Sequence, residues 1–281
     1  MCILRTIGAV ALSFCAGLTT TANADVFQRA QGDATREHVY SIENTSDGGY
    51  VTAGFRDTAP PGAIDEDVLI TKHFADGTVE WQRVWAGPGR DIGYSVQEAV
   101  GGGYIVAAES TSSGAPGVEV LLIRLDPAGS FVWANFYLGS WMADPIHDVH
   151  PGVALDQGFN GQIYVTGSFL GQAQLLAVDP SGALVTNTVY GDPLIATRFA
   201  FTDIKHDPTN GTLVISGTTD TGSAFGLQDP FLFRADPFGN PIWIWNYDFP
   251  DLDPFNEPIL SSRETGDGLD LGPNGDIILN G

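Results

Sequence analysis

Residues 101–108 read GGGYIVAA, residues 119–124 read EVLLIR and residues 126–133 read DPAGSFVW. Gly-Gly between two β-rich runs is a strong hairpin signal, because such turns need positive φ. In Asp-Pro-Ala-Gly the proline fixes φ and the glycine takes the left-handed position. Runs such as Val120–Ile123 are apolar throughout, which predicts burial on both faces. The stretch therefore predicts short antiparallel strands joined by tight turns.

Copies of this stretch recur along the chain at nearly constant spacing. The glycines of the second turn are Gly77, Gly129, Gly182 and Gly239, which lie 52, 53 and 57 residues apart. Each unit reads as four short strands. A four-stranded unit of this length between similar neighbours is typical of a β-propeller blade. The repeat predicts an all-β chain of such blades, and a sandwich of unrelated hairpins is the alternative.

The repeats divide the chain into four nearly complete blades and part of a fifth. We expect blades at residues 37–85, 91–137, 144–190 and 198–247, and a partial blade at residues 263–281. Residues 26–30 (VFQRA) are similar to residues 80–84 (EWQRV), an outermost strand, so we expect them to close the ring by completing the last blade. The fifth unit contains two strands. We therefore expect a fragment of a longer protein; a five-bladed ring with a thin last blade is the alternative.

The N-terminal residues predict export. Arg5 precedes an apolar run, Ile7–Leu18, and Ala22-Asn23-Ala24 has the small-x-small pattern that signal peptidase cuts. The run is too short to span a bilayer of about 30 Å, so residues 1–24 read as a signal peptide cleaved after Ala24. The remainder, residues 25–281, is predicted to be the propeller domain, secreted or periplasmic, with no later membrane span.

Composition narrows the possible partners. The formal net charge is −22, which repels phosphate backbones and predicts no nucleic-acid binding. Both cysteines, Cys2 and Cys15, lie in the predicted signal, so disulfides and thiolate chemistry are not expected in the mature chain.

The repeat resembles a known class of proteins. The runs DGGYVTAG (residues 47–54) and DVLITK (residues 67–72) are similar to secreted bacterial β-propeller repeat proteins, most of which have no assigned function. The turn-to-tryptophan segments are also distantly similar to the PQQ-like, tryptophan-docking propeller repeat. That resemblance implies structural tryptophans that hold one blade to the next, namely Trp81, Trp133 and Trp243. The third unit has Thr186 at this position, which implies a differently packed blade.

One aligned position in the predicted first strands is acidic in three units. The residues are Asp148, Asp203 and Asp270, where the first two units have Ser41 and Ser95. First strands line the central channel of a propeller, so these carboxylates are candidate ligands for a cation such as Ca²⁺. The alternative is that they bind backbone groups or ordered water.

His147 and His150, with Asp144 and Asp148, form a histidine cluster. Residues three apart on a strand face opposite sides, so a polar strand end is favoured over a zinc site or a His–Asp catalytic pair.

An acid at the beginning of the third strand and a base five residues later recur together in three units. Both are lost in the third unit, which predicts that the acids and bases pair across blades. The recurring acids are Asp67, Glu119 and Asp229 and the bases are Lys72, Arg124 and Arg234; the third unit has Gln172 and Ala177 instead.

The motifs favour binding over catalysis. The chain contains no nucleophile elbow, metalloprotease helix motif, phosphate loop or EF-hand loop. We expect a monomeric, non-enzymatic scaffold or recognition surface for a protein or glycan, with no required cofactor. The alternative is an enzyme, either a polysaccharide hydrolase or lyase or a quinoprotein-like oxidoreductase, although the 12 basic residues show no cluster for a quinone. The aromatic tract at residues 243–247 could stack on sugars or form blade core.

Overall fold

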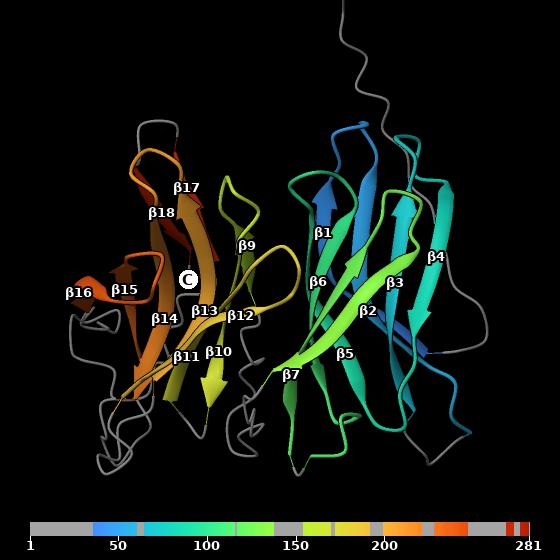
Figure 1. Ribbon diagram of the computed structural model, residues 1–281, viewed down its shortest axis with the longest axis horizontal. Coiled ribbons are helices and arrows are strands. Elements are labelled where there is room, and N and C mark those ends of the chain that lie inside the picture. Colours follow the sequence, from blue (N-terminus) through green and yellow to red (C-terminus); the bar gives the residue numbers. More distant parts are fainter. Residues whose placement is uncertain are drawn as a thin grey trace, which may run out of the picture. The chain divides into compact units, whose positions relative to one another are not determined.

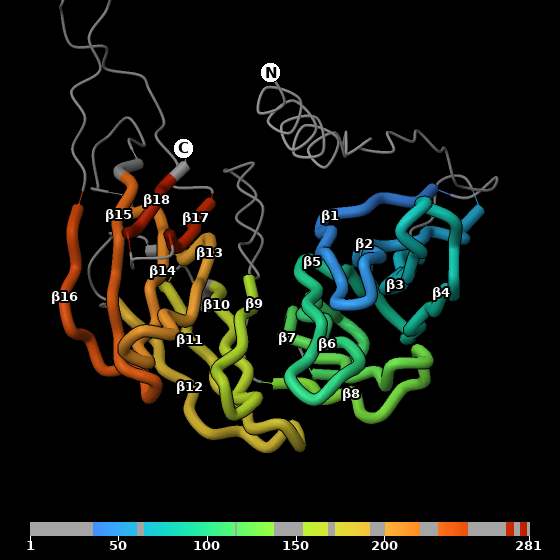
Figure 2. The backbone as a smooth tube through the Cα atoms, turned by 90° about the horizontal axis from the view of Figure 1, so that it is seen from above, coloured from blue at the N-terminus to red at the C-terminus, as the bar shows by residue number. Residues whose placement is uncertain are grey.

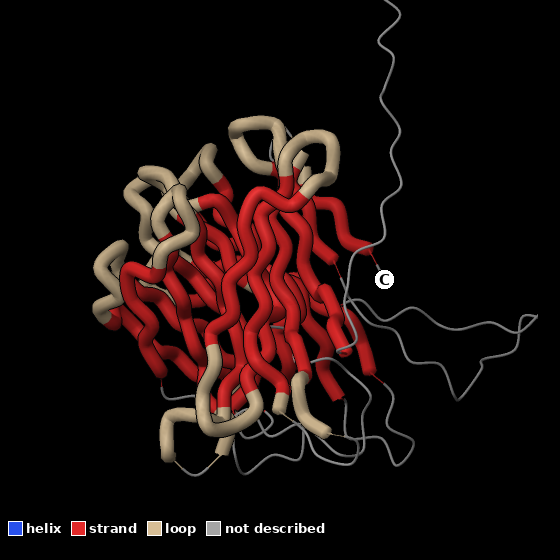
Figure 3. Tube along the Cα trace, turned by 90° about the vertical axis from the view of Figure 1, so that its right-hand side faces the viewer, coloured by secondary structure: helices blue, strands red, loops and turns tan. Residues whose placement is uncertain are grey.

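The structure is a computed structural model that describes residues 36–60, 65–115, 117–137, 154–169, 172–191, 199–220, 228–246, 268–272 and 276–280. The chain divides into two units, residues 1–31 and 32–281, and every described residue belongs to the second. All regular elements in these ranges are β-strands (Figure 3). The prediction of an all-β chain is therefore confirmed for the described residues.

The strands form four four-stranded antiparallel sheets and one two-stranded sheet (Figure 1). Sheet 1 contains β1 (Arg36–Asn44), β2 (Tyr50–Asp57), β3 (Glu66–His73) and β4 (Val79–Trp85). Sheet 2 contains β5 (Asp91–Glu98), β6 (Tyr104–Ser110), β7 (Glu119–Leu125) and β8 (Phe131–Tyr137). Sheet 3 contains β9 (Leu155–Gln157), β10 (Ile163–Phe169), β11 (Gln172–Val178) and β12 (Leu184–Tyr190). Sheet 4 contains β13 (Phe199–Asp207), β14 (Thr212–Asp220), β15 (Gln228–Ala235) and β16 (Pro241–Asn246), and sheet 5 contains β17 (Gly268–Leu271) and β18 (Ile277–Asn280).

Consecutive strands are neighbours in every sheet, as the tube in Figure 2 shows for β1 to β4. The turn between third and fourth strands explains this order. In sheet 2, the Gly129 N–H donates to the Asp126 carbonyl at 3.0 Å, and Gly129 has φ 76°. The Asp126 carboxylate accepts the Ser130 N–H at 2.8 Å, which closes the turn from its other side. Proline and glycine at their fixed positions thus direct the chain back on itself.

The apolar core lies between consecutive sheets. The middle strands supply most of it, and every residue of β6 is buried. One cluster joins Val68 and Ile70 of sheet 1 to Val106 and Leu121 of sheet 2. Similar clusters join sheets 2 and 3, sheets 3 and 4, and sheets 4 and 5. Burial on both faces explains why the middle strands are continuously apolar in sequence.

The first strand of sheet 3 differs from its predicted position. The sequence alignment placed that strand at Asp148-Val149, which lies outside the described residues, whereas the strand paired with β10 is β9. In its register Leu155 pairs with Val165 and Gln157 with Ile163. Pairing begins next to the hairpin turn at Gln157, and the buried apolar residue Leu155 lies at the other end of β9.

Candidate functional site

Asp203, one of the predicted cation ligands, lies on β13 and binds backbone N–H groups. Its Oδ1 accepts the Ile204 N–H at 2.7 Å, and its Oδ2 accepts the N–H of Leu269 on β17 at 2.9 Å. Burial raises its pKa, an effect that nearby Lys205 and the two N–H groups oppose. The carboxylate therefore connects the first strands of sheets 4 and 5.

Asp270 does not share the position of Asp203, so the sequence alignment of the two was wrong. Ser41 and Asp203 each follow a shift in strand register, which marks them as equivalent. In sheet 1 the Thr45 N–H closes the first hairpin, and in sheet 5 the Gly272 N–H does so. Asp270 precedes its hairpin residue by two positions, as Glu43 does in sheet 1, whereas Ser41 precedes it by four. Asp270 is exposed, its Oδ1 accepts the N–H of the next residue at 2.8 Å, and Asp148 lies outside the described residues.

The position of Glu43 carries a polar residue in all five sheets. These residues are Glu43, Gln97, Asp156, Lys205 and Asp270. Asp156 accepts the Gln97 side-chain N–H at 3.1 Å and also accepts the backbone N–H of His206. Burial raises the pKa of Glu43, Lys205 lowers it and Asp156 raises it further, so both neighbouring charges act on Glu43. Within the described ranges, however, no three His, Cys, Asp or Glu side chains lie close enough together to hold a metal ion.

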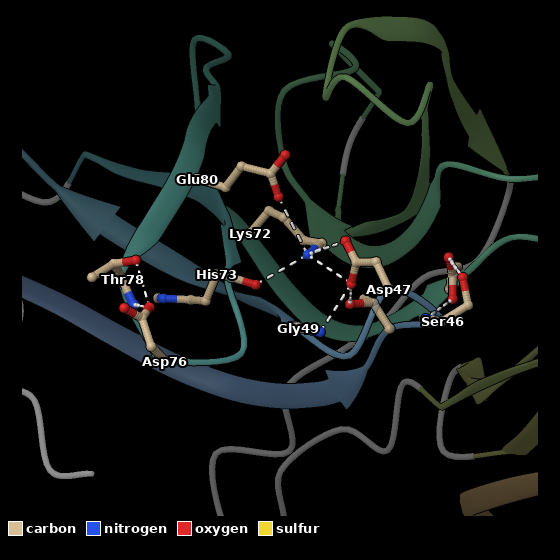
Figure 4. Close-up of polar contacts among 10 residues, drawn as sticks. Ser46, Asp47, Gly49, Lys72, His73, Asp76, Thr78 and Glu80 are labelled. Carbon is tan, nitrogen blue, oxygen red and sulfur yellow. Dashed lines mark hydrogen bonds and ion pairs between the residues drawn. The ribbon is translucent and has the colours of Figure 1, made fainter. Parts of the chain in front are cut away.

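Lys72 is the largest fully buried polar side chain of sheet 1, with 1% of its surface exposed (Figure 4). Its Nζ lies 2.8 Å from Asp47 Oδ2, donates to the His73 carbonyl at 3.0 Å, and lies 3.4 Å from Glu80 Oε2. Buried ammonium groups need such partners, because an unpaired charge is costly to remove from water. Lys72 thereby joins the first hairpin, the end of β3 and the beginning of β4.

Asp47 and Gly49 complete the arrangement around Lys72. The hydrogen bond from Lys72, followed by those from Thr45 and Gly49, holds the pKa of Asp47 well below its usual range. A β-carbon at Gly49 would lie 2.6 Å from Lys72 Nζ and 2.2 Å from the His73 carbonyl oxygen. The glycine at this turn therefore makes space for the lysine, in addition to shaping the turn.

The basic residues of sheets 2 and 4 occupy the place of Lys72, which corrects the predicted acid–base pairing. Arg124 donates to backbone carbonyls, among them that of Gly102 in the first hairpin. Arg234 Nη2 lies 2.9 Å from Asp207 Oδ2, again at the first hairpin. The printed partners of Lys72, Arg124 and Arg234 all belong to the base's own sheet, so for these bases the prediction of pairs across blades was wrong. Sheet 3 has Ala177 here.

The tryptophan of β4 contacts the next sheet at a turn glycine. A β-carbon at Gly129 would lie 2.7 Å from Trp81 Cδ2, so any other residue would collide with the indole. Arg83 Nε donates to the Gly129 carbonyl at 2.8 Å, and its guanidinium lies 5.4 Å from the Trp81 ring centre. We call this arrangement a docking contact: an outermost strand covering the turn glycine of the next sheet and donating to its carbonyl.

Sheets 2 and 3 form the second docking contact. A β-carbon at Gly182 would lie 3.2 Å from Trp133 Cδ2 and 2.5 Å from Asn135 Nδ2. The Gly182 carbonyl accepts the Tyr137 hydroxyl at 2.7 Å and the Asn135 amide at 3.3 Å. Here two donors replace the single arginine of the first contact.

Sheets 3 and 4 form the third docking contact without a tryptophan. The Tyr190 hydroxyl donates to the Gly239 carbonyl at 2.5 Å, and Thr188 lies 3.0 Å from a β-carbon built at Gly239. Thr186 takes the tryptophan position. Sequence reasoning missed both Tyr137 and Tyr190, although each lies four residues after the tryptophan position, and that shared spacing was the available signal.

The outermost strands expose large apolar side chains. These are Phe131, Val132 and Phe136 of β8, Leu184, Val185 and Val189 of β12, and Ile242, Ile244 and Trp245 of β16. Trp243 is partly buried against the cluster of sheets 4 and 5, with Arg234 5.6 Å from its ring centre, while Trp245 is 63% exposed. Each outermost strand lies at the edge of its sheet. An exposed apolar edge is a usual place for a partner to bind.

Comparison with known proteins adds no relationship: no protein-family model and no curated protein matches the chain. The described residues contain no helix of the length and apolar character that a membrane crossing requires. The described residues thus define a class of protein, all-β, with four four-stranded antiparallel sheets and one two-stranded sheet.

Proposed function

We propose that the sheets are blades of an exported β-propeller that acts without catalysis, as a scaffold or recognition surface for a protein or glycan. The supporting fold observation is that consecutive sheets share apolar clusters and repeat the docking contact three times. Repeated units that contact only their neighbours are characteristic of propellers and related repeat folds. The closed ring of blades and the export of the protein are parts of this proposal.

The observation that carries the recognition function is the exposed apolar surface of β8, β12 and β16. Outward side chains of an edge strand can contact a ligand, and its free backbone groups can add a strand or bind polar atoms. Trp245 offers a flat aromatic face with an N–H donor, the combination that suits an amphipathic ligand.

A glycan array tests the proposal when the purified protein is compared with two single variants. We expect Trp245→Ala to weaken glycan binding by about tenfold or more, as removal of one aromatic anchor does. Phe159→Ala is the matched control, because Phe159 is an exposed aromatic residue, 73% accessible, that lies in the first hairpin of sheet 3.

Two results would contradict the proposal. Equal loss in both variants would show that the outermost strands do not carry recognition. Mass spectrometry of the bound sugars supplies the other test, since release of shortened products would favour the enzyme alternative.

A further inference from the structure

Sheets 1 and 2 gather buried carboxylates where β3 and β5 begin. Four acidic residues are almost completely buried there: Glu66, Asp67, Asp91 and Glu109. Charged groups of this kind are retained in a protein interior when a counter-charge, a metal ion or a proton neutralises them. The neighbouring charges show which of these carboxylates lack a counter-charge.

Two arginines neutralise part of the group. Arg36 contacts Asp57 at 3.0 Å and also binds Glu66. Arg90 binds the other oxygen of Glu66 and lies 3.8 Å from Glu109. Among the described residues, neither Asp67 nor Asp91 forms an ion pair, so these two carboxylates carry two negative charges that no arginine offsets.

Asp91 is surrounded by neutral oxygen groups. It is 0% exposed, its Oδ1 accepts the Ser110 hydroxyl, and its Oδ2 accepts the Ser112 hydroxyl at 2.8 Å. Burial raises the pKa of Asp91 in spite of these two hydrogen bonds. The serine oxygens retain lone pairs after donating, so the same atoms can also contact a cation.

Asp67 is the other buried carboxylate without an arginine partner. It is 8% exposed, and its Oδ1 is buried and has no hydrogen-bond partner in the described part of the chain. Burial raises its pKa first, and the carboxylates of Asp65, Asp91 and Asp57 raise it further. The nearby charges that act on Asp67 are thus negative.

The backbone brings the two carboxylates together between the sheets. Asp91 begins β5 and Asp67 lies near the beginning of β3, two strands that contact each other, and Asp91 is one of the carboxylates whose charge acts on Asp67. Next to them, β5 lies directly on β3, because a β-carbon at Gly93 would lie 3.1 Å from a Val68 methyl group. Asp67 directly precedes Val68 and Asp91 lies two residues before Gly93, so the two carboxylates belong to the same part of this contact.

We propose that Asp67 and Asp91 bind one divalent cation, Ca²⁺, between sheets 1 and 2. The ion supplies the two positive charges that the arginines do not, and Ca²⁺ accepts carboxylate, hydroxyl and water oxygens in variable geometry. Two carboxylates, the Ser110 and Ser112 hydroxyls and water form the ligand set, so the site does not need a third acidic ligand. The proposal is independent of the recognition function of the outermost strands.

Calorimetric titration of EDTA-treated protein with CaCl₂ tests the site, together with thermal unfolding with and without Ca²⁺. We expect one Ca²⁺ per chain and a higher Tm in its presence. Asp67→Asn should abolish both the binding heat and the Tm increase. Glu119→Gln is the matched control, because Glu119 begins the third strand of sheet 2 and Asp67 is the second residue of the third strand of sheet 1. Glu119 Oε2 is also buried without a partner in the described residues. This variant should keep both the binding heat and the Tm increase.

The alternative to a bound Ca²⁺ is a proton that the two carboxylates share. In that case the wild-type protein gives no binding heat, and Asp67→Asn raises Tm in the absence of Ca²⁺, which would overturn the proposal. Asp67→Glu covers the case in which Asp67→Asn fails to fold. It keeps a carboxylate at a changed distance, so weaker Ca²⁺ binding is expected, and unchanged affinity would place the ion elsewhere and equally overturn the site.

Discussion

Sheets 1 and 3 follow the same four-strand plan but differ at the two positions that connect their parts. Sheet 1 has Lys72 beneath its first hairpin and Trp81 on the next turn glycine. Sheet 3 has Ala177 and Thr186 at these places. It nevertheless contacts sheet 4 through the Tyr190 hydroxyl.

The difference shows which part of the docking contact is constant and which part can be replaced. The turn carbonyl accepts a hydrogen bond in all three docking contacts, from Arg83, from Asn135 and Tyr137, or from Tyr190. The indole covers the turn glycine in only two of them. A buried carbonyl without a partner loses its hydration uncompensated, whereas apolar volume can be filled in several ways. The donor is therefore the more general requirement of this interface.

The largest effect is expected when Trp81 of sheet 1 is replaced by threonine, the residue that sheet 3 has at this position. Trp81→Thr removes an indole that is 9% exposed and packs on Gly129. We expect a loss of about 3 kcal/mol in the free energy of unfolding, the lower end for losing a buried aromatic residue. Urea denaturation measures it. A loss below that of Trp245→Ala, whose indole is exposed, would contradict the assigned role of Trp81.

A smaller effect is expected at the first hairpin. Lys72→Met keeps the side-chain volume and removes the charge, with an expected cost of about 2 kcal/mol near neutral pH, typical of hydrogen bonds to a charged group. The Lys72 hydrogen bond lowers the pKa of Asp47, so this contribution is complete above about pH 4, the unfolded value, and is lost as pH falls through the folded value.

The pH dependence of the free energy of unfolding tests whether the contribution of Lys72 is lost at acid pH. The difference in stability between the wild-type protein and Lys72→Met should narrow below about pH 4 as Asp47 becomes protonated. Ala177→Gly in sheet 3 provides the control, because that substitution changes no charge and its effect should not vary with pH. A difference that stayed constant down to acid pH would show that the ion pair with Asp47 contributes nothing.

The smallest effects are expected from removing single hydroxyl groups. Tyr190→Phe leaves the Gly239 carbonyl without its tyrosine donor, at a cost of about 1 kcal/mol. Tyr137→Phe should cost less, because Asn135 also donates to the Gly182 carbonyl. Thermal unfolding of both variants ranks them. The reverse order would mean that the hydroxyls are not the source of the third docking contact's stability.

The sequence sufficed for the strands and turns because local chemistry determines both. Glycine and proline at Asp126–Gly129 specify a turn without reference to the rest of the chain, and the continuous apolar run of β7 implies burial. The all-β expectation depended on these local signals, and it was correct over the described ranges.

The polar contacts between sheets were harder to predict, because spacing along a strand does not identify a partner on another sheet. Asp270 resembled Asp203 in sequence, yet two residues of register separate them once the hairpin is located. The predicted pairing of acids and bases across blades failed for a similar reason: Lys72 lies against its own hairpin and pairs with Asp47. Tyr190 was overlooked because its function depends on a carbonyl of the next sheet.

The docking contact also determines which piece of this chain can be exchanged or duplicated as a module. Trp81 and Arg83 belong to sheet 1, but the glycine they cover, Gly129, belongs to sheet 2. Cutting between sheets would therefore separate every outermost strand from its matched turn. A graft that runs from the outermost strand of one sheet through the turn that follows the third strand of the next keeps both halves together, so the engineering unit of this protein is offset from its sheets by one strand.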